Sequence, residues 1–263
     1  MHFISVRFNG WRNYEEIVGK CGLSLLKNLE QAKKNIPSHL TTLIQSTVVT
    51  IPNEMLFEEL CRLYLITREY NSAIYNTIMQ IYARHVSNFC PPNYYIHSSS
   101  VVRIEKIDSE KNLKHSKEKI YILSEGIDEL ERICSKDILE KSDIFIYILC
   151  SNTDDIAHFS LLCLDKNKKQ LLHYDSLLYQ LDFKVLKSYF KEKNIDIQNF
   201  FNLGPSGLQQ KSFDCSIYAL CKIKQLCFST FYDEKLISQE NMDCHRRLIL
   251  SELLEDQLYL FYP

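Results

Sequence analysis

Three short apolar runs in the middle of the chain do most to limit the fold. Residues 144–149 (IFIYIL) are β-branched, aromatic or leucine, and they predict a strand that is buried on both faces. Residues 158–164 and 170–175 predict two more strands, and the polar turn at 165–169 between them predicts a hairpin. A fourth strand is expected over residues 195–203.

Helical periodicity dominates the rest of the chain. Apolar residues recur at helical spacing in most of the first 90 residues, over 181–193, after Cys215 and over 238–257. No internal repeat and no linker rich in proline or glycine divides the sequence. We therefore predict an α+β fold, in which a central mixed sheet of about four to five strands packs between helices.

Charge and cysteine content exclude several classes of function. Lys and Arg total 31 and Asp and Glu total 33, so the net charge of −2 argues against a nucleic-acid partner. No apolar run approaches the ~20 residues of a membrane span. The ten cysteines include no CxxC pair and no Cys/His pair at zinc spacing, so no metal is expected. Reduced thiols in a reducing intracellular compartment, cytoplasm or nucleus, explain them best.

Cys215 is the candidate nucleophile. It follows a polar loop at 208–214 and begins a predicted helix. Unpaired backbone N–H groups and the positive end of the helix dipole favour the thiolate at such a position, and the same N–H groups can hold an oxyanion. Taken alone, with ten cysteines in the chain, Cys215 is better explained as one more buried thiol.

His158 and Asp175 are the candidate base and its carboxylate. His158 begins one strand of the predicted hairpin and Asp175 ends the other, so hairpin pairing can bring the two side by side. A carboxylate in that position fixes the tautomer of an imidazole. His173 is a rival base on the same strand as Asp175, but side chains at i and i+2 on one strand do not readily meet in line.

Gln209 is the candidate oxyanion donor. Its side-chain amide stands six residues before Cys215, across a loop, and can act together with the Cys215 backbone N–H. Gln210 is the neighbour that could take this role instead.

These residues together resemble a known family. Their order, His158, Asp175, Gln209 and Cys215, is that of the ubiquitin-like-protein proteases, the Ulp/SENP family of clan CE cysteine peptidases. The gaps of 17 residues from His158 to Asp175 and of six from Gln209 to Cys215 also match the family pattern. The phrase QQxSxDC is most similar to the deneddylase branch, and the likeness is strongest over residues 158–228.

The resemblance implies an isopeptidase that releases ubiquitin, Nedd or SUMO from a lysine. It implies that Cys215 is the nucleophile, that His158 is the base and later the acid, and that Asp175 orients His158. Gln209 would help to hold the oxyanion, and no metal or organic cofactor would be required. Phe159, where the family usually has Trp, would line a narrow groove that admits only glycine at the last two substrate positions.

The resemblance also implies a division of the chain and marks one further departure. Residues 61–263 would form the Ulp/SENP-like catalytic domain, with its nucleophile at the start of a buried helix. Residues 1–60 would be a helical extension, a candidate substrate-docking element. Ser216 stands where the family usually has Gly, and this narrows backbone freedom beside the oxyanion hole.

Two other functions stay open from the sequence. A YopJ-like acetyltransferase of the same clan would share the order of histidine, acid and cysteine, although its acid is normally Glu. A catalytically weak relative would bind a modifier without cleaving it. Clan members in bacteria resemble effectors that are delivered into host cells, and this is a second hypothesis for localisation.

Overall fold

The structure, a computed structural model, describes most of the chain. The described residues are 3–7, 27–45, 52–64, 72–108, 119–123, 136–153, 156–205, 214–229 and 234–262. The candidate residues Gln209 and Gln210 lie outside these ranges.

Most described strands belong to one mixed sheet. Its strands are β2 (Tyr94–Asp108), β3 (Lys119–Leu123), β4 (Ile144–Thr153), β5 (Ile156–Asp165), β6 (Gln170–Tyr174), β7 (Gln180–Leu181) and β8 (Asn199–Leu203). Within the described residues their order is β7-β3-β2-β4-β5-β6-β8. The central strands β4, β5 and β6 are antiparallel, whereas β2 runs parallel to β4 and β8 parallel to β6. A separate parallel pair joins β1 (Phe3–Arg7) to β9 (Leu258–Tyr262).

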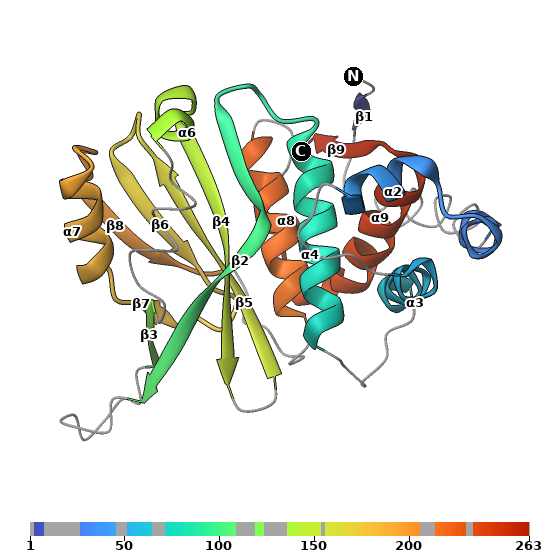
Figure 1. Cartoon of the computed structure of the whole chain (residues 1–263), viewed down its shortest axis with the longest axis horizontal. Coiled ribbons are helices and arrows are strands. Elements are labelled where there is room, and N and C mark those ends of the chain that lie inside the picture. The colour runs from blue at the N-terminus through green and yellow to red at the C-terminus, as the bar shows by residue number, and fades with distance from the viewer. Residues whose placement is uncertain are drawn as a thin grey trace.

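Helices cover both faces of the larger sheet. They are α2 (Ser38–Gln45), α3 (Asn53–Tyr64), α4 (Ser72–Ser87), α6 (Lys136–Lys141), α7 (Lys184–Glu192), α8 (Cys215–Cys227) and α9 (Met242–Glu255), with 3₁₀ turns η1 (Glu234–Leu236) and η2 (Gln239–Asn241). Residues 27–34 are also helical. Figure 1 shows α7 on one face and α4 and α8 on the other, with α9, α3 and α2 beyond them.

The alternation of side chains along β4 explains the unbroken apolar run in its sequence. Phe145, Tyr147 and Leu149 belong to the core under α7, whereas Ile146 and Ile148 belong to the larger core under α4 and α8. All five are 0% exposed, as expected for a central strand whose two faces are both covered.

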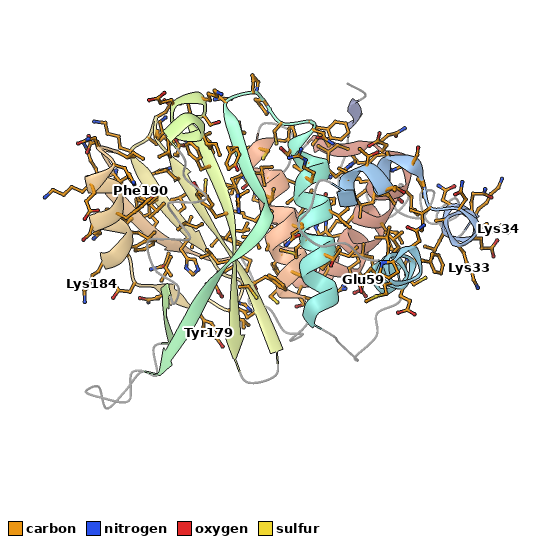
Figure 2. The ribbon with its side chains drawn as sticks, viewed as in Figure 1. Lys33, Lys34, Glu59, Tyr179, Lys184 and Phe190 are labelled. Carbon is orange, nitrogen blue, oxygen red and sulfur yellow. The ribbon has the colours of Figure 1, made fainter. Side chains whose placement is uncertain are left out.

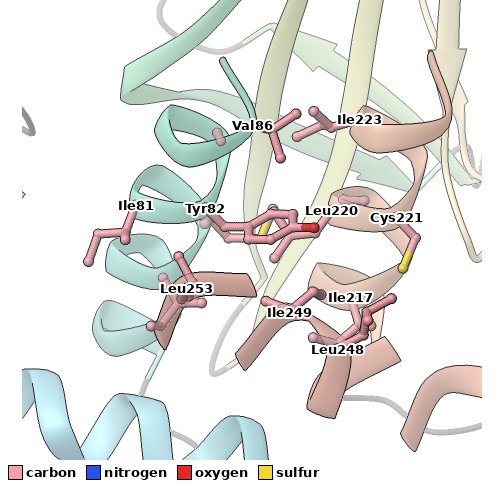
Figure 3. Packing of buried hydrophobic residues seen from close by; sticks show 14 of the residues in the cluster. Ile81, Tyr82, Val86, Ile217, Leu220, Cys221, Ile223, Leu248, Ile249 and Leu253 are labelled. Atoms are coloured by element: carbon pink, nitrogen blue, oxygen red, sulfur yellow. The ribbon is translucent and has the colours of Figure 1, made fainter. Parts of the chain in front are cut away.

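The larger core joins α4, α8 and α9. Figure 3 shows Tyr82 reaching from α4 toward α8, with Leu220 and Ile249 close by. Tyr82 is 1% exposed, and Leu220 and Ile249 are also buried. This packing fixes α8, and therefore Cys215 at its first residue, against the sheet.

The described part of residues 1–60 packs into that same core. Leu29, Leu40, Leu56 and Leu60 are all buried members of the larger cluster. Figure 2 shows Glu59 of α3 and Phe190 of α7 on opposite sides of the molecule. The division into an extension over 1–60 and a catalytic domain over 61–263 stays a prediction, and the buried leucines mean that deleting the extension would also remove core side chains.

The α+β class, with a mixed sheet between helices, is confirmed. The sheet is wider than the four or five strands expected, because β3 and the two-residue β7 continue it at one edge. Strand β2 is hard to recognise in the sequence, because three serines at 98–100 and the adjacent charges Glu105 and Lys106 interrupt its apolar alternation. No helix in the described parts of the chain has the length and apolarity to cross a bilayer.

Candidate active site

Cys215 is the first residue of α8. Asp214 occupies the N-cap position, and every residue from Cys215 to Lys224 is buried. Cys215 itself is 4% exposed. The sulfur therefore lies where the unpaired N–H groups of the first helical turn and the helix dipole favour negative charge. None of the eight cysteines that the structure describes forms a disulfide.

His158 and Asp175 form a buried pair beside Cys215. His158 Nε2–H donates to Asp175 Oδ2 at 2.7 Å, and the two side chains are 8% and 0% exposed. The pairing follows from the hairpin: β5 and β6 are antiparallel with Leu161 opposite Tyr174, so the chain just beyond β6 turns back alongside His158.

The loop after β6 holds the Asp175 carboxylate in place. The backbone N–H groups of Leu177 and Tyr179 both donate to Asp175 Oδ1, at 2.7 and 3.3 Å. The Tyr179 ring packs against His158, with ring centroids 5.5 Å apart. Figure 2 shows Tyr179 at the end of the sheet next to β7. One carboxylate oxygen is thus fixed by backbone groups and the other is directed at His158.

His158 also bonds Cys215, and this affects its charge. Burial alone would lower the pKa of His158, but hydrogen bonds to Asp175 and Cys215 raise the pKa to about 10. His158 is therefore an imidazolium at neutral pH. An imidazolium beside a sulfur atom favours the thiolate, which is the nucleophilic form.

His173, the rival base, has a different environment. Its Nδ1–H donates to Asn202 Oδ1 at 2.9 Å, and its Nε2 accepts from the Ser160 hydroxyl at 3.1 Å. Burial lowers the pKa of His173, which fits a neutral ring with one donor and one acceptor. Both ring nitrogens are engaged in packing β6 to its neighbours β5 and β8.

Phe159 lies in the core. It is 2% exposed and belongs to the larger cluster under α8. Its ring therefore contributes packing, and little of its surface is open to a substrate in this state. The expectation that Phe159 lines a glycine-only groove stays a prediction.

Ser216 is accommodated without backbone strain. It is the second residue of α8, and it is not among the described non-glycine residues with positive φ. Its side chain is 1% exposed, and its hydroxyl has no hydrogen-bond partner in the described part of the chain. The departure from Gly therefore places an unsatisfied hydroxyl, rather than a strained backbone, next to Cys215.

Replacing Ser216 with Ala is expected to raise the free energy of unfolding by about 1 kcal/mol. The substitution removes a buried unsatisfied hydroxyl and improves helix propensity. Urea unfolding followed by circular dichroism measures the change. Ser229→Ala, at an exposed position just beyond α8, is the matched control and should stay within about 0.5 kcal/mol of the wild type. A loss of stability in Ser216→Ala would show that the hydroxyl has a partner.

A second buried ion pair adjoins the nucleophile, and no sequence pattern predicts it. Arg246 Nη2 on α9 donates to Asp214 Oδ1 at 2.6 Å, with the side chains 2% and 0% exposed. The two residues are 32 positions apart, so no local pattern links them. Among the described residues, no group of three or more His, Cys, Asp or Glu side chains could hold a metal ion.

Comparison with known proteins supports the fold. No protein-family model matches the sequence, and no curated protein sequence matches it. The structure of the C-terminal Ulp1 protease domain in complex with Smt3, the yeast orthologue of SUMO, aligns with a TM-score of 0.54 and 17% identity over 88% of this chain and 95% of that chain. The chain has the Ulp1 protease-domain fold.

A second solved structure agrees with the Ulp1 protease-domain fold. It is the SUMO protease Ulp1 with its catalytic cysteine oxidised to a sulfinic acid, with a TM-score of 0.54 and 16% identity over 88% of this chain and 94% of that one. The Ulp/SENP-like fold that the residues between 158 and 228 predicted is therefore confirmed. The closer likeness to the deneddylase branch stays a prediction.

Proposed function

We propose that this protein is a cysteine isopeptidase that cleaves a ubiquitin-like modifier after its C-terminal Gly-Gly. The observation that carries the proposal is the position of His158, which bonds Asp175 at 2.7 Å and also bonds Cys215 at the start of α8. A nucleophile, a base and an orienting carboxylate in one chain of hydrogen bonds are the components of triad catalysis.

The first half of the reaction forms a thioester. The Cys215 thiolate attacks the carbonyl carbon of the modifier's last glycine, and the oxyanion that forms is held by the Cys215 N–H and by Gln209. The His158 imidazolium then gives its proton to the lysine amine as the C–N bond breaks. The lysine-bearing protein leaves, and the modifier stays bound to Cys215 as a thioester.

The second half releases the modifier. His158, now neutral, takes a proton from water as the water oxygen attacks the thioester carbonyl. The C–S bond breaks, the thiolate is restored beside the imidazolium, and the modifier leaves with a free carboxyl group, which gives its remaining proton to solvent. Asp175 keeps the His158 ring in one orientation through both halves.

The low exposure of the Cys215 and His158 side chains supports a substrate that ends in glycines. Cys215 is 4% exposed and the His158 side chain 8% exposed, so little room is left for side chains next to the scissile bond. The Ulp1 domain of the same fold was solved with Smt3 bound, which supports a modifier partner for this chain. Ubiquitin, Nedd and SUMO are the candidates, and the QQxSxDC segment favours Nedd.

Release of a fluorophore from the C-terminus of each modifier tests the proposal. The wild type should cleave at least one of the ubiquitin, Nedd and SUMO substrates, and Cys215→Ala should cleave none. Turnover that persists in folded Cys215→Ala would overturn the assignment.

The two alternative functions predict other results. Transfer of acetyl groups from acetyl-CoA, with no modifier cleaved, would favour the acetyltransferase alternative. Stable binding of a modifier without turnover would favour the binding-only alternative.

The pH dependence of the reaction should reflect His158. Because its pKa is raised to about 10, the imidazolium that protonates the leaving amine is present below that pH and is lost as pH rises through it. We expect kcat/KM to stay high up to about pH 10 and to fall above it. Circular dichroism at each pH provides the control for unfolding. A decline centred near pH 6.5 would show that Asp175 and Cys215 do not stabilise the imidazolium.

Replacing Gln209 with Ala is expected to lower kcat by about 10²–10³-fold, the usual effect of removing one oxyanion donor. The KM should change little, because the oxyanion exists only in the transition state. Gln210→Ala is the matched control and should retain wild-type kcat. The reverse pattern would assign the oxyanion role to Gln210.

A further inference from the structure

The residue just before the nucleophile is held by two other elements. The Asp214 carboxylate is fully buried, accepting from Arg246 Nη2 on α9 at 2.6 Å and from Gln239 Nε2 in η2 at 2.7 Å. Arg246 is only 2% exposed, so both charges of this pair are removed from water.

This arrangement is unusual for an aspartate at a helix start. An N-cap aspartate normally accepts a hydrogen bond from the second or third N–H of its own helix. The Asp214 side chain makes no such bond to α8. Its two oxygens are directed instead at Arg246 and Gln239, so the carboxylate does not occupy the first-turn N–H groups that would stabilise an anion at Cys215.

The charge of Asp214 also needs compensation. A carboxylate one residue from Cys215 opposes the thiolate, because like charges in a poorly solvated site repel strongly. The Arg246 guanidinium in direct contact with the carboxylate offsets that repulsion. Tyr218, one turn along α8, is also titratable, and burial together with the Asp214 charge raises its pKa to about 12, so it stays neutral.

We infer that Arg246 is a positioning residue for the nucleophile, acting through Asp214. It draws the Asp214 carboxylate away from the first turn of α8, which leaves the N–H groups there for an oxyanion, and it balances the carboxylate charge beside the Cys215 thiolate. Gln239 fixes the second carboxylate oxygen. The role in holding an oxyanion rests on the proposed function, whereas the effect on Cys215 reactivity does not.

Alkylation of Cys215 by iodoacetamide as a function of pH tests this inference without any modifier. Tandem mass spectrometry separates Cys215 from Cys221, which lies on the same tryptic peptide. Arg246→Met leaves the carboxylate uncompensated, so the alkylation profile of Cys215 should move up by about one pH unit and the rate at neutral pH should fall about tenfold. Asp214→Asn removes the negative charge next to Cys215, so the profile should move to lower pH.

The alkylation profile is expected to shift in opposite directions in the two variants, and a purely structural role for Arg246 would not produce that pattern. A folded Arg246→Met or Asp214→Asn protein with an unchanged profile would overturn the inference, and so would shifts of both in the same direction. Where Arg246→Met does not fold, the near-isosteric Asp214→Asn decides the question by itself. Because alkylation needs no substrate, the inference can fail while a modifier is still cleaved, and it can hold if no modifier is cleaved.

Discussion

Replacing Asp175 with Asn is expected to lower kcat by about 10⁴-fold while the chain stays folded. The reason lies in the two backbone donors. Leu177 N–H and Tyr179 N–H both point at Asp175 Oδ1, so the amide oxygen of an asparagine must take that place. The amide NH₂ group then faces His158 Nε2 and turns that nitrogen into an acceptor.

The resulting tautomer is the wrong one for catalysis. With Nε2 accepting, the single proton of a neutral His158 ring moves to Nδ1, which faces Cys215 and can no longer accept the thiol proton. Steady-state cleavage of the modifier substrate measures the loss. Asp182→Asn is the matched control and should keep wild-type kcat, because the Asp182 carboxylate contacts the Lys184 N–H and ammonium at the start of α7. Activity of Asp175→Asn within tenfold of the wild type would remove Asp175 from the mechanism.

Removing the Glu252 carboxylate is expected to lower the free energy of unfolding by about 3–5 kcal/mol. Glu252 on α9 is 0% exposed and pairs with Lys224 of α8, which is 1% exposed. It also accepts from the Tyr82 hydroxyl at 2.5 Å and from the Tyr259 N–H at 2.8 Å. One carboxylate thus joins α4, α8, α9 and β9.

Glu252→Ala would remove the carboxylate that pairs with the buried Lys224 ammonium, and the loss would be a large part of an ordinary domain's stability. Urea unfolding measures it. Glu240→Ala, at an exposed carboxylate in η2, is the control and should change stability by less than about 0.5 kcal/mol. A Lys224→Met/Glu252→Leu double variant, which buries no charge, should be more stable than Glu252→Ala. A loss below 1 kcal/mol in Glu252→Ala would mean that water or another group compensates Lys224.

The central sheet was predictable because its residues carry local signals. Each signal depends on neighbours within a few residues: the apolar run at 144–149 and the polar turn at 165–169 for the sheet, and the amphipathic pattern around Leu186 and Phe190 for the helix α7 that covers it. The proximity of His158 and Asp175 was predictable for the same reason, because the short turn of the hairpin determines which residues of β5 lie beside those that end β6.

Features that depend on distant pairing were not predictable in the same way. The apolar pattern of strand β2 is interrupted, and the strand is recognisable only through its partners β3 and β4. The pairs Asp214–Arg246 and Lys224–Glu252 join α8 to α9 across some 30 residues of chain, and nothing in their local sequence marks them. Arg246 and Lys224 are buried, but an Arg or a Lys in a helix that also carries other charged residues normally indicates a solvent-exposed position.

Covalent trapping tests the central claim most directly. Ubiquitin, Nedd and SUMO, each carrying an electrophile in place of the terminal carboxylate, are incubated with the wild type and with Cys215→Ala, and the adduct is mapped by peptide mass spectrometry. We predict that at least one modifier becomes attached to the wild type through Cys215, and that Cys215→Ala gives no adduct. Failure of all three modifiers to react with the folded wild type, or attachment to a different cysteine, would contradict the account.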